Sequence, residues 1–227
     1  MVRVICILIG YVFGLFQTAF FIGKLHGIDI REHGSGNSGT TNALRVLGTK
    51  VGLMVFFGDA MKCILAVVLV RLLFGQSHPE MIHLLCLYTG AGAILGHNYP
   101  FYMNFKGGKG IAATAGMVIA FDPWFTLVGV IVFFSTFFIT HFVSLGSLLV
   151  YSILMVMMVL FGQMGYFSEM SQANLLEMYL VFALLMVLAF WKHRENIVRL
   201  MQGKERKTYL TKKNKENITE NKEIKKN

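Results

Sequence analysis

Residues 111–140 read IAATAGMVIAFDPWFTLVGVIVFFSTFFIT, a continuous apolar stretch whose only charged residue is Asp122. A transmembrane helix needs about 20 mostly apolar residues, so this stretch is too long for a single span. Pro123 has no backbone N–H and disfavours helical geometry at the residue before it. We therefore expect two helices that meet at Asp122-Pro123, with a lipid bilayer as their solvent.

Similar apolar stretches recur along the rest of the chain. Hydrophobic residues make up 55% of the 227 residues, more than the roughly 45–50% of a soluble domain. The first stretch lacks an Ala-x-Ala cleavage pattern and is expected to be retained. The sequence predicts an all-α membrane protein, one domain over residues 1–203. It has seven transmembrane helices: two from residues 111–140, and the others at residues 4–23, 51–74, 81–96, 145–162 and 175–191.

Positive charges alternate between the predicted loops. The loops at residues 75–80, 122–123 and 163–174 contain no Lys or Arg. Because basic residues stay on the cytoplasmic side of a membrane, this pattern predicts an external amino terminus and a cytoplasmic carboxyl terminus. The basic residues of the other loops are Lys24, Arg31, Arg45, Lys50, Lys106, Lys109 and twelve more after Trp191.

The net charge of +9 does not indicate a nucleic-acid partner. Residues 204–227 hold nine Lys or Arg and four Glu, so 9 − 4 = +5 of the charge lies in this segment. Its Lys/Asn/Glu composition predicts a disordered tail, which could also contact anionic membrane lipids. Cys6, Cys63 and Cys86 lie in apolar segments without paired spacing, so neither a disulfide nor a metal site is predicted.

One pair of opposite charges falls inside a predicted span. Asp59 and Lys62 are three residues apart, which places them on one helical face where they can form an ion pair. Charges at that depth must face protein or water. We favour an ion pair that braces the bundle or positions a cytoplasmic loop, with direct substrate contact as the alternative.

The first polar cluster is GSGNSGTTN, residues 34–42, followed by Arg45. Glycines let the backbone approach a ligand, and successive N–H groups with Ser and Thr hydroxyls form an anion-binding concavity. Arg45 can add a forked cation for phosphate. The alternative is a flexible linker, but the two Asn, two Thr and nearby Arg favour an anion site. The glycine spacing does not match a nucleotide-hydrolysing P-loop.

Two further clusters lie in loops predicted to be on the same side. GHNYP (residues 96–100) and FKGGKG (105–110) place Lys106 and Lys109 in a glycine-rich turn, where they could bind an anion or simply anchor the loop. We interpret His97 as a structural histidine. The third cluster follows the last span, and its His193 and Asn196 share a helical face. A basic flank after a span is the alternative there. The hydroxyls of VSLGS (143–147), those of Ser144 and Ser147, could join the same site.

These clusters resemble, in order and spacing, the three motifs of the bacterial membrane glycerol-3-phosphate acyltransferases that use acyl phosphate. Residues 34–45 match the first motif, with Thr40 where Ala is frequent. Residues 96–109 match the second, with Tyr99 in place of Phe. Residues 193–205 match the third in full. Neither departure removes a polar group, so the activity is not in doubt.

The resemblance implies a seven-helix enzyme of the bacterial cytoplasmic (inner) membrane whose active site faces the cytoplasm. It would transfer an acyl group from acyl phosphate to the 1-hydroxyl of glycerol 3-phosphate without a cofactor, giving lysophosphatidic acid and inorganic phosphate. Glu205 would be structural, held by a basic residue. The implied catalytic residues are Ser35, His193 and Asn196, and the implied substrate-binding residues are Gly36, Asn37, Thr41, Asn42, Arg45, Lys106, Gly107, Gly108, Lys109 and Ser147.

Two other classes of protein would carry similar features. A transporter of organic phosphates would also need anion-binding loops, but no paired, interrupted segments suggest an inverted repeat, and the basic clusters lie at one face rather than near the midplane. A non-catalytic scaffold would leave three polar loops without a use. The sequence therefore favours the enzyme, without predicting its oligomeric state.

Overall fold

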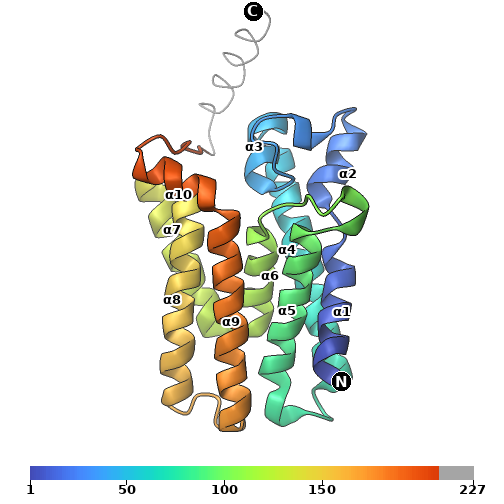
Figure 1. The fold of residues 1–227 in the computed structure, drawn as a ribbon, viewed down its shortest axis with the longest axis vertical. Helices are drawn as coiled ribbons and strands as arrows, with labels where there is room; N and C mark the ends of the chain where they lie inside the picture. The colour runs from blue at the N-terminus through green and yellow to red at the C-terminus, as the bar shows by residue number, and fades with distance from the viewer. Residues whose placement is uncertain (210–227) are drawn as a thin grey trace, which may run out of the picture.

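The structure, a computed structural model, describes residues 1–209 and is all-helical in that range. Long helices stand side by side, and the short helices α3 and α10 cap one end of the bundle, opposite the amino terminus (Figure 1). We call it the α3–α10 end. The α-helices are α1 Val2–Gly14, α2 Thr18–Leu25, α3 Thr40–Leu47, α4 Thr49–Phe74, α5 Ile82–Asn98, α6 Ile111–Phe121, α7 Pro123–Thr140, α8 Val143–Gln163, α9 Gln172–Lys192 and α10 Arg194–Met201.

Every predicted span is helical, and five candidate spans are long and apolar enough to cross a membrane. These are α1 with α2, and then α4, α7, α8 and α9. The remaining two predicted spans are shorter: α5 has 17 residues and α6 has 11. At 1.5 Å per residue, α6 rises only about 16 Å, roughly half of a hydrocarbon core. The count of seven crossings stays a prediction.

The division of residues 111–140 at Asp122-Pro123 is confirmed. Helix α6 ends at Phe121, and α7 begins at Pro123. The Asp122 carboxylate accepts hydrogen bonds from the backbone N–H groups of Trp124 (2.8 Å) and Phe125 (3.3 Å). An N-cap carboxylate followed by proline is a strong signal for the start of a helix. The carboxylate accepts hydrogen bonds from free N–H groups of the first turn, and proline at the first helical position has no N–H that needs a partner.

The first predicted span, residues 4–23, is not one continuous helix. It breaks between Gly14 and Thr18, so α1 and α2 are separate. Breaking a helix frees backbone carbonyls that must find donors in a membrane. Buried Gln17 and Lys62 supply them: Gln17 Nε2 donates to Gly14 O (3.3 Å), and Lys62 Nζ donates to Phe16 O (2.5 Å). The apolar pattern gave no sign of this break, because both donors act through the tertiary structure.

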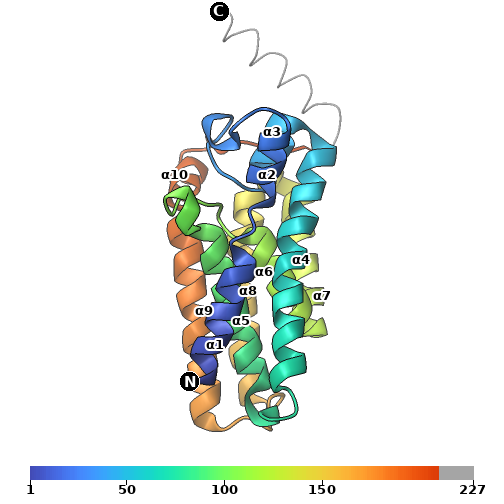
Figure 2. The ribbon, with the colours of Figure 1, turned by 90° about the vertical axis from the view of Figure 1, so that its right-hand side faces the viewer.

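Small residues set the closest helix contacts. Helix α1 lies along α5 (Figure 2), where a Cβ on Gly10 would sit 1.9 Å from Thr89 O. Between α4 and α6, a Cβ on Gly116 would sit 2.1 Å from Ala60 O. Lipid tails are as apolar as the helix side chains, so the hydrophobic effect does not drive helices together in a membrane. Close backbone packing of this kind does so instead. The bundle can therefore hold short helices such as α6 in a fixed place.

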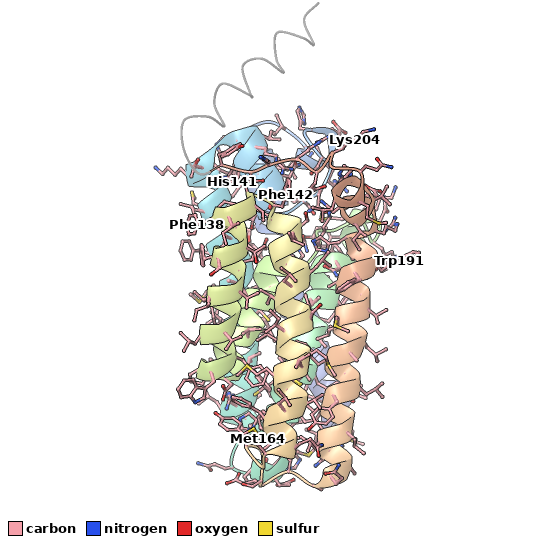
Figure 3. The ribbon with its side chains drawn as sticks, turned by 90° about the vertical axis from the view of Figure 1, so that its left-hand side faces the viewer. Phe138, His141, Phe142, Met164, Trp191 and Lys204 are labelled. Carbon is pink, nitrogen blue, oxygen red and sulfur yellow. The ribbon has the colours of Figure 1, made fainter. Side chains whose placement is uncertain are left out.

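The predicted tail starts at Lys204, yet its first residues pack onto the bundle. The segment after Lys204 crosses the α3–α10 end towards His141 (Figure 3). There the Thr208 N–H donates to His141 O (2.9 Å), and Thr208 is only 1% exposed. Side-chain and backbone hydrogen bonds order this stretch despite its polar composition. The rest of the predicted tail, residues 210–227, lies outside the described residues.

Candidate active site

A cavity of about 470 Å³ opens at the α3–α10 end. Most of its lining comes from the loop before α3 and α3 itself, the starts of α6 and α8, and α10 with the segment that follows it. Side chains of α4 (Phe56 and Asp59), α5 (His97), α7 (Phe133) and the end of α9 (Lys192) complete the wall. The cavity thus gathers all three polar clusters. The predicted site residues that line it are Ser35, Gly36, Asn37, Thr41, Asn42, Arg45, Lys109, Ser147, His193 and Asn196.

Asn42 organises the first loop. Its Oδ1 accepts a hydrogen bond from the Ser35 N–H (2.8 Å), and its Nδ2 donates to Ile30 O (3.1 Å) and His33 O (3.0 Å). The loop can fold around this amide because Gly34 has a positive φ of 63°, and a Cβ there would lie 2.3 Å from Asn42 Oδ1. Asn42 therefore shapes the loop, which leaves the exposed Ser35 at the cavity surface.

Arg45 lies in α3 with its guanidinium at the cavity wall. One Nη donates to Thr208 Oγ1 (2.8 Å) and to Arg206 O (3.3 Å). Burial, with the positive charge of Arg206, lowers the pKa of Arg45, although a guanidinium keeps its charge near neutral pH. The remaining donors of the fork are available to an anion in the cavity.

The glycine-rich turn brings Lys109 to the cavity but leaves Lys106 outside it, exposed. Gly107 and Gly108 do not line the cavity either. Their N–H groups donate to Asn98 O and His97 O, each at 3.1 Å, at the carboxyl end of α5. These donors satisfy helix-end carbonyls rather than forming an anion nest. The turn's contribution to the cavity is therefore the Lys109 side chain.

Lys109 is the half-buried cation at the centre of the site. Its Nζ donates to Asn196 Oδ1. Burial and the neighbouring charge of Arg199 lower its pKa to about 8, although the Glu205 carboxylate acts in the opposite direction. The ammonium form therefore still predominates at pH 7, and it is poorly solvated. A poorly solvated cation gains more from an incoming phosphate than an exposed one does.

Glu205 has the structural role and the basic partner that the sequence predicted. Its Oε1 accepts from Asn196 Nδ2 (2.7 Å) and Ser144 Oγ (3.0 Å), and its Oε2 accepts from Arg199 Nε (2.9 Å). Burial opposes ionisation, but these hydrogen bonds outweigh it and lower the Glu205 pKa. With Lys109 on its other side, the Asn196 amide is fixed in orientation. Ser144 belongs to the VSLGS stretch (143–147), whose hydroxyls the sequence suggested as part of this site.

His193 joins α9 to α10 and is buried in the cavity wall. Its Nδ1 donates to Ala189 O (2.8 Å), so Nε2 is the acceptor in the neutral ring. Burial and the Lys109 charge lower the His193 pKa to about 4. A neutral imidazole therefore offers one hydrogen-bond acceptor to the cavity at pH 7. Ser147 is close to this wall but donates its hydroxyl to Val143 O (2.8 Å).

A second, apolar groove of about 350 Å³ adjoins the polar cavity. The residues that the two share at their junction are Thr40, Thr41, Phe56, Ile111, Phe133, Val143 and Ser147. From there the groove runs between α4, α6, α7 and α8, past side chains that are almost all aliphatic or aromatic. Sequence reasoning did not find this groove, because the apolar residues that line it cannot be distinguished in sequence from residues that face lipid. The combined volume suits a molecule with an anionic head and an apolar tail.

The site is a binding pocket rich in cations, and its two buried carboxylates are ion-paired, Glu205 with Arg199 and Asp59 with Lys62. Among residues 1–209, no group of three His, Cys, Asp or Glu side chains is placed to hold a metal ion. Arg45 and Lys109 can bind phosphate groups, and the neutral His193 with the fixed Asn196 amide can hydrogen-bond a hydroxyl or carbonyl. This arrangement suits reactions of phosphorylated substrates in which positioning supplies most of the catalysis.

Comparison with known proteins agrees with this chemistry. The family model described as glycerol-3-phosphate acyltransferase matches residues 4–203. Proteins named glycerol-3-phosphate acyltransferase are 39% identical in Exiguobacterium sibiricum, covering 95% of this chain and 98% of that protein, and 37% identical in Bacillus subtilis, covering 91% and 98%.

Two solved structures have the same fold. Both are of PlsY (YgiH), an integral membrane glycerol 3-phosphate acyltransferase. The glycerol 3-phosphate form has a TM-score of 0.75 and 33% identity, covering 91% of this chain and 96% of that one. The lysophosphatidic acid form has a TM-score of 0.72 and 32% identity, covering 92% and 96%. This chain belongs to the glycerol-3-phosphate acyltransferase family and is an integral membrane enzyme of the PlsY type.

Proposed function

We propose that this enzyme transfers a fatty acyl group from acyl phosphate to the 1-hydroxyl of glycerol 3-phosphate, releasing lysophosphatidic acid and inorganic phosphate. The observation that carries the proposal is the junction of the two cavities. Cations surround one side of the junction, and almost entirely apolar side chains continue on the other. Acyl phosphate has this combination in one molecule, with its reactive carbonyl at the boundary.

The side chains divide the task by their chemistry. Arg45 and Lys109 bind the phosphate groups, and Ser35 with Asn37 lines the loop that closes around the polar substrate. His193 accepts a hydrogen bond through Nε2. The Asn196 amide has a second N–H besides the one donated to Glu205, and this N–H can stabilise the carbonyl oxygen.

The donor follows from the absence of a strong base. No His in this sequence is followed four or five residues later by Asp, the pair that activates the hydroxyl in coenzyme-A-dependent acyltransferases. The buried carboxylates of the cavity do not replace it, because both Glu205 oxygens accept hydrogen bonds and Asp59 is ion-paired with Lys62. An acyl phosphate is a mixed anhydride whose phosphate leaves easily. The leaving phosphate can take the hydroxyl proton as the new ester bond forms, so catalysis is assisted by the substrate.

The donor is tested with purified protein and glycerol 3-phosphate. Acyl phosphate, acyl-coenzyme A and acyl carrier protein are supplied in turn at the same acyl chain length. We expect lysophosphatidic acid from acyl phosphate alone, with inorganic phosphate released in equal amount. Comparable turnover with acyl-coenzyme A would overturn both the donor and the substrate-assisted mechanism.

We place the enzyme in the bacterial cytoplasmic membrane with the α3–α10 end in the cytoplasm, where both phosphorylated substrates occur. The alternation of basic loops supports this orientation. Single cysteines introduced at Gly36 and at Gln163 lie at opposite ends of the bundle in this topology. A membrane-impermeant thiol reagent added to intact cells should label only the cysteine at position 163, and labelling of both would refute the orientation.

A further inference from the structure

Lys62 is buried at the break between α1 and α2. It is 5% exposed, and its ammonium lies 3.2 Å from Gly14 O and 2.5 Å from Phe16 O. These carbonyls are among those that the break frees from helical hydrogen bonding. Lys62 therefore closes the end of α1 as a bound cation would, except that its side chain tethers it to α4.

Asp59 balances this charge within the same turn of α4. Its Oδ1 lies 3.0 Å from Lys62 Nζ, and it accepts a hydrogen bond from Thr18 Oγ1 (3.0 Å) at the start of α2. The predicted ion pair is thus present, and it ties both sides of the break to α4. Burying two charges is costly, so this ion pair by itself is weak evidence for added stability.

The Lys62 ammonium also contacts His97, which leads from the break to the active site. Lys62 Nζ lies 2.9 Å from His97 Nδ1, closer than the 3.6 Å between that nitrogen and Asp59 Oδ1. An ammonium has only donors, so His97 Nδ1 is the acceptor and the ring proton is on Nε2. Gln17 adds a second link by donating to His97 O (3.0 Å). The break therefore fixes both the ring and the backbone of His97.

His97 in turn supports the turn that carries Lys109. The Gly108 N–H donates to His97 O (3.1 Å), and a Cβ on Gly108 would lie 2.1 Å from His97 Nε2. The turn therefore rests directly on the imidazole ring. Lys109 is the next residue, and it donates to Asn196 in the cavity. A continuous set of contacts connects Lys62 to Lys109. Asp59 and His97 line the cavity, whereas Lys62 does not.

We propose that Lys62 is a positioning residue. Acting as a tethered monovalent cation at the helix break, it holds His97 in place and through it the turn that presents Lys109 to the substrate phosphate. The inference rests on the proposed function only for the role of Lys109. Its prediction is that the effects of Lys62 and Lys109 on the reaction are coupled, whereas the effects of Lys62 and Arg45 are independent.

The test is a double-mutant cycle. Lys62→Met alone would leave Asp59 as an unpaired buried charge, so the pair is neutralised together as D59N/K62M, which preserves volume and the acceptor for Thr18. We expect D59N/K62M to lower kcat/KM at least tenfold in the wild-type background and in Arg45→Lys, but less than twofold when Lys109→Met is already present. Equal losses in all three backgrounds would show that the pair only braces the bundle, and would overturn the proposal.

Two further measurements separate a positioning role of Lys62 from a general loss of stability. Thr18→Val removes a hydrogen bond from the same network without touching His97, and it should lower thermal stability while keeping kcat/KM within about threefold. Lys62→Ala should regain activity in a saturable manner when methylammonium is supplied, and failure of rescue by any small amine would count against a tethered cation.

If the wild-type protein uses no acyl phosphate, the donor proposal fails. The same cycle is then run on the binding of glycerol 3-phosphate measured by calorimetry, with the same expected coupling. Coupling between the pair and Lys109 in binding would support the positioning role, and its absence would overturn it.

Discussion

The polar cavity and the apolar groove meet at the same residues, yet they select their contents by different physics. In the cavity, Lys109, Arg45 and Glu205 each have a fixed hydrogen-bond partner. In the groove, no such partners constrain the occupant, and lining residues such as Phe57 (63% exposed) also face outward. The head of a substrate is therefore selected by directional charge, and its tail by available volume alone.

This difference predicts unequal sensitivity to substitution. A charged hydrogen bond to a reacting phosphate is worth several kcal/mol in a poorly solvated site. Adding or removing one methylene in an apolar pocket changes the binding free energy by only about 1–3 kcal/mol. Substitutions in the cavity should therefore reduce the rate with every donor, whereas substitutions in the groove should change the ranking of donors by chain length.

The largest effect is expected for Lys109→Met. The substitution keeps the length of the side chain but removes the ammonium that we propose to bind phosphate and that donates a hydrogen bond to Asn196. We expect kcat/KM to fall by about 10²–10³-fold, the magnitude of losing one preorganised charged donor. Lys106→Met is the matched control, because Lys106 belongs to the same turn but is exposed and outside the cavity. A control variant as impaired as Lys109→Met would mean that the structure assigns the wrong lysine.

Arg45→Lys should have the next largest effect. The lysine keeps the positive charge but has a single ammonium group. The guanidinium of Arg45 can donate to Thr208 through one nitrogen and to an anion through another. We expect about a tenfold loss of kcat/KM, or ~1.4 kcal/mol. Arg31→Lys, which pairs with Asp29 outside the cavity, should stay within about twofold. An unchanged rate and Michaelis constant in Arg45→Lys would remove Arg45 from the phosphate site.

Gly129→Leu should separate the groove from the cavity. Gly129 lies in α7 on the groove wall, and a Cβ there would meet its nearest neighbours at an ordinary 3.8 Å. Packing does not require this glycine, but the added side chain would fill the groove. We expect the ratio of kcat/KM for long over short acyl phosphates to fall about fivefold, or roughly 1 kcal/mol. Ile131→Phe, on the exposed side of α7, is the control, and an unchanged ratio in Gly129→Leu would place the tail elsewhere.

The smallest effect is expected from pH. Because the Lys109 pKa is lowered to about 8, the ammonium is present below that pH and lost above it. The kcat/KM of the free enzyme should therefore be halved near pH 8 and decline further as the pH rises. Lys109→Arg stays charged over the whole range, so its remaining activity should not show this decline. The same decline in the arginine variant would assign the titration to another group.

Several features were determined by the sequence itself. Apolar length located helices in each predicted span, although the first span is two helices. Asp122-Pro123 divided residues 111–140 at the observed position, because a capping carboxylate and a missing N–H act locally. The i, i+3 spacing of Asp59 and Lys62 predicted their ion pair for the same reason. The motif spacing identified the three polar clusters that line the cavity.

Only the tertiary structure decided how those clusters are used. It separated Lys109 from Lys106 and engaged the Gly107 and Gly108 N–H groups with the end of α5, although both lysines belong to one turn. It broke the first span at Gln17, because distant Lys62 and the buried Gln17 amide satisfy the carbonyls that a helix would otherwise satisfy. It also formed the apolar groove from side chains that resemble any lipid-facing residue. Hydropathy and spacing report what a residue prefers locally, whereas these outcomes depend on which donors and volumes other helices bring to it.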